Sequence, residues 1–132
     1  MPKSKPHIEF MPIEMDDDWE TPPGYPDGMH QKVLNSNLDE ANKTGSRSRL
    51  LRISPGAFST EPFVHDHWEE VYLVEGDLVV GNDANGQGGE QFFAPTYACR
   101  PPGVLHGPFT SKTGCVMFEL HYYQSESESD LD

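Results

Sequence analysis

The segment that decides the fold is PFVHDHWEE, residues 62–70, which continues as VYLV at residues 71–74. Because residues i, i+2 and i+4 of a β-strand project from one face, His65, His67 and Glu69 are expected to share a face. Two imidazoles and a carboxylate on one face are suitable ligands for a divalent transition metal ion. Taken alone, the segment fits equally well an exposed strand that carries histidines and acids without a metal.

A second segment, RPPGVLHGP at residues 100–108, is expected to present a further histidine from a rigid turn. Its prolines fix the backbone that enters the turn, and its glycine permits a positive φ. His106 is thereby held at the start of the strand that follows. In a chain built of strands, it is the expected third imidazole beside His65 and His67.

The remainder of the chain predicts short strands separated by turns. Residues 46–54 alternate with a period of two, and Pro55-Gly56 ends that strand. Further strands are expected at residues 7–13, 29–34, 70–75, 78–80, 91–94, 97–100, 106–110 and 115–123. Gly76-Asp77 is expected to separate two strands, and residues 112–114 to form a hairpin turn between the last two. No long segment shows helical periodicity, so the sequence predicts an all-β sandwich or barrel with minimal helix.

Length and charge restrict the classes of protein. The chain has 132 residues, enough for one domain, and 22 acidic against 9 basic residues give a formal net charge of −13. Such a charge argues against binding to nucleic acid or to an anionic membrane surface. No segment approaches the ~20 apolar residues that span a bilayer, and no apolar run follows the N-terminal lysines. A cytoplasmic location is therefore expected.

The two histidine segments resemble the paired motifs of the cupin superfamily, G…HxH…E…G followed by G…PxGxxH. The resemblance covers about residues 46–123 and implies a single-domain cupin, which is a jelly-roll β-barrel. The first motif ends at Gly76, and the second runs from Gly89 to His106. The second motif fits closely, although its final Asn is missing and Thr110 lies near that place.

The first motif departs from the family pattern at its carboxylate. Cupins usually keep three or four residues between the second histidine and the glutamate, whereas one residue separates His67 from Glu69 and two separate it from Glu70. Glu69 keeps the usual spacing to Gly76 and shares the histidine face, so it is the preferred ligand. Glu70 lies on the opposite strand face and is the alternative.

A closer likeness lies within the cupins. Gly88-Gly89, APTY at residues 94–97 and GVLHG at residues 103–107 resemble the ChrR-like cupins and the acetylacetone-cleaving dioxygenases. Those enzymes have a three-histidine Fe(II) site with no required carboxylate, which implies one divalent transition metal ion, Fe(II) being favoured over Zn, Mn or Ni. The ligands implied are three histidines and one optional carboxylate: His65, His67, His106 and Glu69.

The resemblance implies an enzyme that holds its metal in an apolar pocket and acts on a small molecule. Arg100 and Tyr97 are the candidate catalytic residues, which would hold a substrate anion or enolate. The favoured reaction is Fe(II)-dependent oxidative cleavage of a C–C bond in a small diketone or hydroxyketone. The alternatives are a non-oxidative cupin enzyme, such as an isomerase, decarboxylase or lyase, and a metal- or ligand-binding module without turnover.

The ends of the chain are expected to differ from its middle. Residues 1–45 should form strands and loops that pack on the barrel of residues 46–123 or exchange with a second copy. Cupins often cover the edges of N-terminal strands by such exchange, so a homodimer is predicted. Residues 124–132 have almost nothing to bury and are expected to be a disordered acidic tail. On the last strand, Glu119 and His121 share one face with Met117, and the sequence does not decide whether that face points inward.

Overall fold

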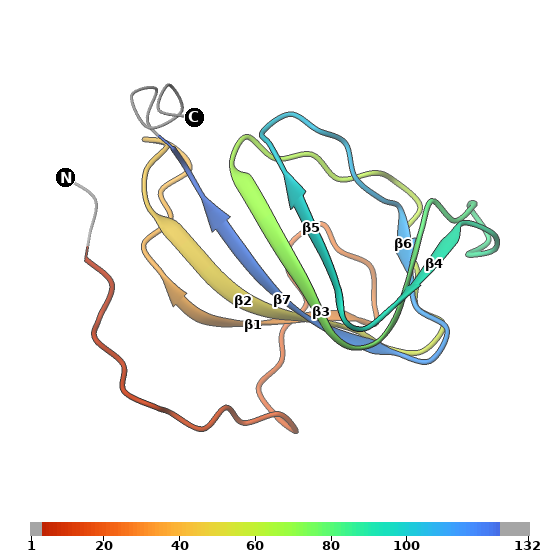
Figure 1. Ribbon diagram of the computed structural model, residues 1–132, viewed down its shortest axis with the longest axis horizontal. Helices are drawn as coiled ribbons and strands as arrows, with labels where there is room; N and C mark the ends of the chain where they lie inside the picture. The colour runs from red at the N-terminus through yellow and green to blue at the C-terminus, as the bar shows by residue number, and fades with distance from the viewer. Residues whose placement is uncertain (1–3, 125–132) are drawn as a thin grey trace.

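The computed structural model describes residues 4–124, which form an antiparallel jelly roll (Figure 1). The strands of this part of the chain are β1 (Met29–Ser36), β2 (Ser46–Ile53), β3 (Trp68–Val80), β4 (Glu90–Phe93), β5 (Thr96–Arg100), β6 (Phe109–Thr110) and β7 (Cys115–Tyr122). No helix occurs in the described residues, so none there can cross a membrane. The predicted all-β architecture with minimal helix is confirmed. The predicted tail lies, from residue 125 on, outside the described residues.

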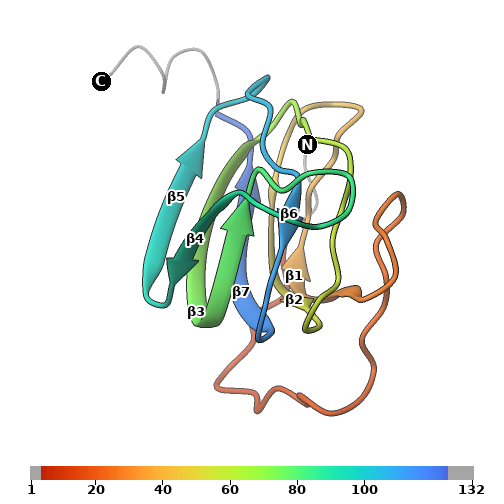
Figure 2. The same ribbon diagram turned by 90° about the vertical axis from the view of Figure 1, so that its right-hand side faces the viewer.

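β3 is the strand that joins the two layers of the jelly roll. Its residues 68–76 pair with β7, and residues 69–73 also pair with β5. Its residues 77–80 pair with β4, and residues 79–80 also pair with β6. In the larger layer the strands follow the order β1-β2-β7-β3, and β5 also pairs with β3. Figure 2 shows the course of β3 between its neighbours.

The change of layer takes place at Gly76. The sequence predicted that Gly76-Asp77 would divide this region into two strands, and this is wrong, because β3 continues through it. Gly76 has a φ of +84°, which favours glycine, and a Cβ there would lie 2.0 Å from the carbonyl oxygen of Gly114. The missing side chain lets β3 pass close to a neighbouring backbone and bend without ending.

Asp77 holds the loop that precedes β7. Its buried carboxylate accepts hydrogen bonds from the backbone amides of Lys112 (3.0 Å) and Thr113 (2.8 Å) and from the hydroxyl of Ser111 (3.0 Å). Burial opposes its ionisation, but hydrogen bonds from the hydroxyl (2.6 Å) and the amide of Thr113, followed by the one from the Lys112 amide, hold the pKa of Asp77 well below its ordinary value. The hairpin predicted at residues 112–114 is wrong, because β6 and β7 pair with different parts of β3 and not with each other.

The barrel interior changes from apolar to charged along β2 and β7. Four paired inward positions are buried and apolar: Leu51, Ile53, Cys115 and Met117. Farther along the same strands, Arg49 pairs with Glu119 and Arg47 pairs with His121. The face of β7 that carries Glu119 and His121 is therefore the inner one, and the charged end of the barrel is where the histidine motifs meet.

The N-terminal segment does not form the strand predicted at residues 7–13. This stretch has no regular structure, and Ile8 and Phe10 are exposed. An alternating pattern becomes a strand only where a neighbouring strand accepts and donates its ladder hydrogen bonds. In the described structure β1 pairs along its length with β2, while the segment before it meets β1 at the isolated bridge between Glu20 and Gln31. Figure 1 shows the segment running outside the sheet.

Candidate metal centre

The first histidine motif lies at the entrance to β3. His65 and His67 belong to the bend that precedes the strand, so the expectation that they stand on a strand is wrong. The bend nevertheless brings their rings together, with centroids 4.6 Å apart and planes inclined by 15°. Glu69, the second residue of β3, points inward and is buried. The three side chains therefore gather at one end of β3.

The second motif is attached directly to the first through the backbone. Phe63 and His106 exchange two hydrogen bonds: the Phe63 amide donates to the His106 carbonyl (2.7 Å), and the His106 amide donates back (2.9 Å). The Gly103 amide donates to the carbonyl of His65 (2.8 Å). These bonds place the imidazole of His106 with its centroid 5.2 Å from that of His65.

Three candidate ligands from the two motifs converge. One ligand atom each of His65, Glu69 and His106 lies within 4.8 Å of the others, and the Nε2 of His106 is 3.7 Å from Oε1 of Glu69. The ring of His67 stands beside this group through its contact with His65. The arrangement brings imidazole and carboxylate donors to one point, as a divalent transition metal ion requires.

Hydrogen bonds at the ring nitrogens leave lone pairs for a metal. Nδ1 of His67 lies 3.1 Å from the Trp68 carbonyl oxygen, and Nδ1 of His106 lies 3.3 Å from the Val104 carbonyl oxygen. Because a carbonyl only accepts, each Nδ1 carries the proton and each Nε2 keeps its lone pair. Nε2 of His65 is buried and has no hydrogen-bond partner among the described residues. A bound cation would satisfy that buried nitrogen, so the residues present fit a metal.

The pKa values of these histidines favour the neutral form. Burial, followed by the neighbouring His67, lowers the pKa of His65 to about 4. Burial also lowers the pKa of His67 and of His106. All three imidazoles are therefore uncharged near neutral pH, which is the state that binds a metal ion.

Glu69 is held in place by two donors. Nη1 of Arg100 donates to its Oε1 (3.0 Å), and Nε2 of His121 lies 3.1 Å from its Oε2. Burial and the charge of Glu119 oppose its ionisation, but the hydrogen bond from His121 and the nearby imidazoles outweigh them, so the pKa of Glu69 lies below its ordinary value. The centre thus contains a buried carboxylate in its ionised form.

Glu70 and Tyr97 lie on the other side of the sheet. The Glu70 carboxylate accepts hydrogen bonds from the hydroxyls of Tyr97 and Tyr122, and Tyr97 is exposed. The structure therefore brings Arg100 to the histidine cluster and leaves Tyr97 away from it. The physical reason is the period of two along β5, because positions 97 and 100 differ by an odd number and face opposite sides.

Sequence reasoning missed a second group of buried polar residues behind Glu69. Arg49 donates to Oε1 of Glu119 through Nε (2.9 Å) and Nη2 (2.8 Å), to Gln31 (2.7 Å) and to the Tyr25 hydroxyl (2.9 Å). Burial disfavours ionisation of Glu119, but the charge of Arg49 outweighs it and holds its pKa well below the ordinary value. The sequence contained a signal, since Arg49 shares the face of the apolar Leu51 on its alternating strand.

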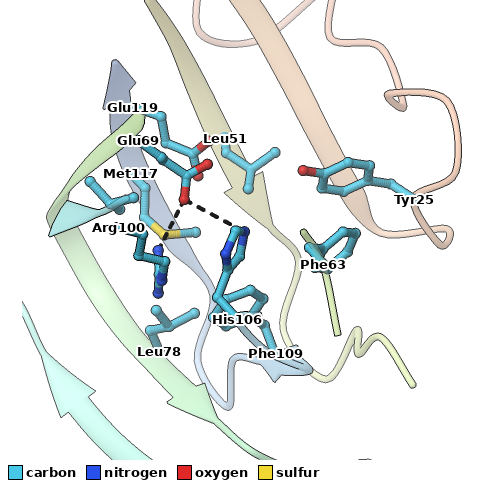
Figure 3. Close-up of a pocket in the computed structure, with 11 residues that line it drawn as sticks. Tyr25, Leu51, Phe63, Glu69, Leu78, Arg100, His106, Phe109, Met117 and Glu119 are labelled. Carbon is cyan, nitrogen blue, oxygen red and sulfur yellow. Dashed lines mark hydrogen bonds and ion pairs between the residues drawn. The ribbon is translucent and has the colours of Figure 1, made fainter. Parts of the chain in front are cut away.

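A narrow pocket opens beside the cluster. Figure 3 shows Glu69 with dashed contacts to Arg100 and His106, and Phe63 on the opposite wall. The guanidinium of Arg100 lies 5.6 Å from the ring centroid of Phe109. The enclosed volume is about 30 Å³, room for about one water molecule. The pocket shares with small-molecule sites a lining of apolar walls around a few convergent polar groups, in a volume well below the roughly 300 Å³ at which such sites begin.

Comparison with known proteins places this arrangement in a family. A family model described as the ChrR Cupin-like domain matches residues 13–124. The chain belongs to the ChrR cupin-like family. Its membership confirms the cupin resemblance seen in the two histidine motifs. A search of curated proteins found no match.

Solved structures of similar fold have varied functions. An RmlC-like cupin from Shewanella frigidimarina superposes with a TM-score of 0.62 at 21% identity, covering 92% of this chain and 96% of that one. An acetylacetone dioxygenase from Acinetobacter johnsonii gives 0.63 at 20%, covering 95% and 83%. The polyketide cyclase RemF from Streptomyces resistomycificus gives 0.61 at 18%, covering 90% and 89%. At these identities the likeness establishes the cupin jelly roll and no more.

Proposed function

We propose that this cupin is a metal-dependent enzyme that acts on a small molecule. Its ligands to one divalent transition metal ion would be the three histidines of the two motifs and one carboxylate: His65, His67, His106 and Glu69. The observation that carries the proposal is the buried, unpartnered Nε2 of His65, which lies in a group whose ligand atoms are within 4.8 Å of one another. A buried nitrogen without a partner is costly unless a ligand satisfies it.

Fe(II) is the metal we favour, and oxidative cleavage of a C–C bond in a small diketone or hydroxyketone is the reaction. When bound, the ion would supply a Lewis acid that polarises a substrate carbonyl and a redox centre for the reaction with oxygen. The likeness to an acetylacetone dioxygenase supports this choice among the cupin activities. Zn, Mn and Ni are the alternatives that the same donors accept.

The protein's own residues would bind and orient the substrate. Arg100 carries its charge into the pocket wall beside Glu69, and its guanidinium has N–H donors beyond the one that contacts that carboxylate. It would hold a carbonyl or enolate oxygen. Phe63 and Phe109 form apolar walls that limit the entry of water and strengthen that contact.

A non-oxidative reaction is the second candidate. The buried, ionised carboxylate of Glu69 lies in the pocket wall, hydrogen-bonded to Arg100 and His121. In this second candidate Glu69 would not bind the metal, and its carboxylate would accept a proton from a substrate carbon next to a carbonyl, which is the step that isomerases and lyases need. The likeness to a polyketide cyclase agrees with chemistry of this kind.

The test is metal analysis combined with turnover. Protein purified without oxygen and loaded with Fe(II) should bind one ion per chain and consume oxygen with at least one member of a panel of β-diketones and hydroxyketones. His106→Ala should lose both the metal and the oxygen uptake. Metal binding without oxygen uptake, but with isomerisation or decarboxylation of a panel member, would favour the second candidate. Metal binding without any turnover would indicate a binding module.

A further inference from the structure

His121 is a fully buried imidazole between the candidate metal centre and a guanidinium. It lies on the inner face of β7 with none of its surface exposed. Its ring centroid is 4.7 Å from that of His67 and 6.1 Å from that of His65, so it adjoins the cluster. One of its ring nitrogens faces a guanidinium, which donates hydrogen bonds, and the other faces carboxylates, which accept them.

Arg47 determines which nitrogen of His121 carries the proton. Nε and Nη2 of Arg47 lie 3.1 Å and 2.7 Å from Nδ1 of His121. A guanidinium has only donors, so Nδ1 must be the bare nitrogen that accepts. The proton of the neutral imidazole is therefore on Nε2.

The Nε2–H of His121 points at two carboxylates. It forms a hydrogen bond of 3.1 Å with Oε1 of Glu119 and lies 3.1 Å from Oε2 of Glu69. The Glu119 oxygen also accepts two hydrogen bonds from Arg49. Among residues 4–124, the contact that the structure gives to Oε2 of Glu69 is the one with Nε2 of His121. The other oxygen of Glu69, Oε1, faces His106 and Arg100.

Direct ligation of a metal by Nε2 of His121 conflicts with this arrangement. A neutral imidazole that binds through Nε2 carries its proton on Nδ1, where it would oppose the N–H groups of Arg47. The ligand atoms of Glu69, Glu119 and His121 also lie within 4.8 Å of one another. A second ion among them is nevertheless disfavoured, because His121 would again need its proton on Nδ1 and because Glu119 already binds the guanidinium of Arg49.

We propose that His121, its tautomer fixed by Arg47, is a positioning residue that donates to Oε2 of Glu69 and turns Oε1 toward the metal. The inference rests on the proposed metal site and deepens it. It predicts that His121 contributes to metal affinity only through Glu69. Partners of this kind behind a ligand usually change metal affinity about 10–100-fold.

The test is a double-mutant cycle on Co²⁺ affinity, measured by competition with a chelator. His121→Ala should weaken Co²⁺ binding about 10–100-fold in the wild-type background and should have no further effect in the Glu69→Ala background. Arg47→Met should show the same dependence on Glu69. His121→Gln, which keeps an N–H donor, should recover part of the affinity. Tyr122→Phe, which removes a hydrogen bond to Glu70 on the outer face, is the matched control and should leave affinity unchanged.

The outcomes separate the inference from the proposal on which it rests. Losses for His121→Ala and Glu69→Ala that add fully, with no recovery in His121→Gln, would show that His121 is itself a ligand and would overturn the inference. If His121→Ala does not fold by circular dichroism, the cycle of Arg47→Met with Glu69→Ala gives the same decision. A folded wild-type chain that binds no Co²⁺ would overturn the proposed metal site together with the inference.

Discussion

The carboxylates of Glu69 and Glu70 lie on opposite faces of β3, although the residues are adjacent in the sequence. Glu69 is 4% exposed and contacts the histidine cluster and Arg100. Glu70 accepts hydrogen bonds from tyrosine hydroxyls on the outer face. The alternation of the strand thus brings Glu69, and not Glu70, to the histidine cluster.

Replacement of these two glutamates should have unequal effects on metal binding. Glu69→Gln should weaken Fe(II) or Co²⁺ binding by at least about tenfold, because it removes an ionised oxygen from the cluster. Glu70→Gln should leave affinity unchanged. The metal-to-protein ratio after dialysis against graded chelator measures both.

The histidine variants give a reference for the metal loss expected when a ligand is removed. His65→Ala, His67→Ala and His106→Ala should each remove most of the metal, since each would take one imidazole from the proposed ligand set. Full retention of metal in His106→Ala would contradict a site shared by the two motifs. If Glu69→Gln and Glu70→Gln lost the same amount of metal, Glu69 would not act as a metal ligand.

The free energy of unfolding of the metal-free protein should fall as the pH drops from about 6.5 toward about 4. The folded-state pKa of His65 is lowered to about 4, so in this window the unfolded chain binds more protons than the folded one. Stability therefore increases with pH across the window and decreases on acidification. The carboxylates of Glu69 and Glu119 add a further loss only near and below the ordinary glutamate pKa of about 4.3.

Urea unfolding at several pH values between about 5 and about 7 measures this slope. His65→Asn should make the slope smaller, because one of the three histidines whose pKa is lowered in the folded chain is gone. A slope that is unchanged in His65→Asn would show that this histidine does not sense the pH change.

Much of the fold and of the candidate centre was predictable from the sequence, because both depend on local patterns. Alternation identified the strands that pair in the larger layer, and the rigid turn before His106 identified its attachment to the cluster. The predicted turn at Gly76 failed because a glycine that turns a chain and one that bends a continuous strand look the same in a sequence. Which of these occurs is decided by the backbone of Gly114, a distant neighbour.

The residues that sequence reasoning missed depend on pairing between distant strands. The register that sets Arg49 beside Glu119 joins positions 70 residues apart, and no local pattern encodes it. The inward direction of His121 follows from that register. Tyr97 lies on the outer face for a simpler reason, since positions 97 and 100 of β5 differ by an odd number and therefore face opposite sides of the sheet.

Removal of one partner of the buried Arg49–Glu119 pair should destabilise the fold strongly. Both side chains are about 5% exposed or less, and the other partner would be left as an uncompensated buried charge. Arg49→Met is expected to lower the free energy of unfolding by about 3–5 kcal/mol, and Arg49→Met combined with Glu119→Leu by clearly less. Chemical denaturation of the metal-free variants measures both.

The exposed pair of Lys43 and Asp66 is the matched control for that experiment. Its atoms are 3.9 Å apart and both side chains are at least half exposed, so Lys43→Met should cost less than about 1 kcal/mol. If Arg49→Met lowered the free energy of unfolding by as little as Lys43→Met, the buried pair would not contribute to stability. A double variant as unstable as Arg49→Met alone would show that lost packing, and not the unpaired charge, causes the effect.

The N-terminal segment should hold two copies of the chain together. Five of its apolar side chains are exposed in the single chain: Ile8, Phe10, Met11, Ile13 and Met15. Burial of Phe10 against a second copy is worth about 2 kcal/mol, and a symmetric dimer has two such contacts, so Phe10→Asp should weaken dimerisation by about 1,000-fold. Analytical ultracentrifugation across micromolar concentrations measures the change, with Phe93→Asp, an exposed aromatic residue of β4, as the control expected to keep the wild-type dimer. A wild-type chain that sediments as a monomer at these concentrations would contradict the prediction, and a dimer unaffected by Phe10→Asp would move the interface to another face of the barrel.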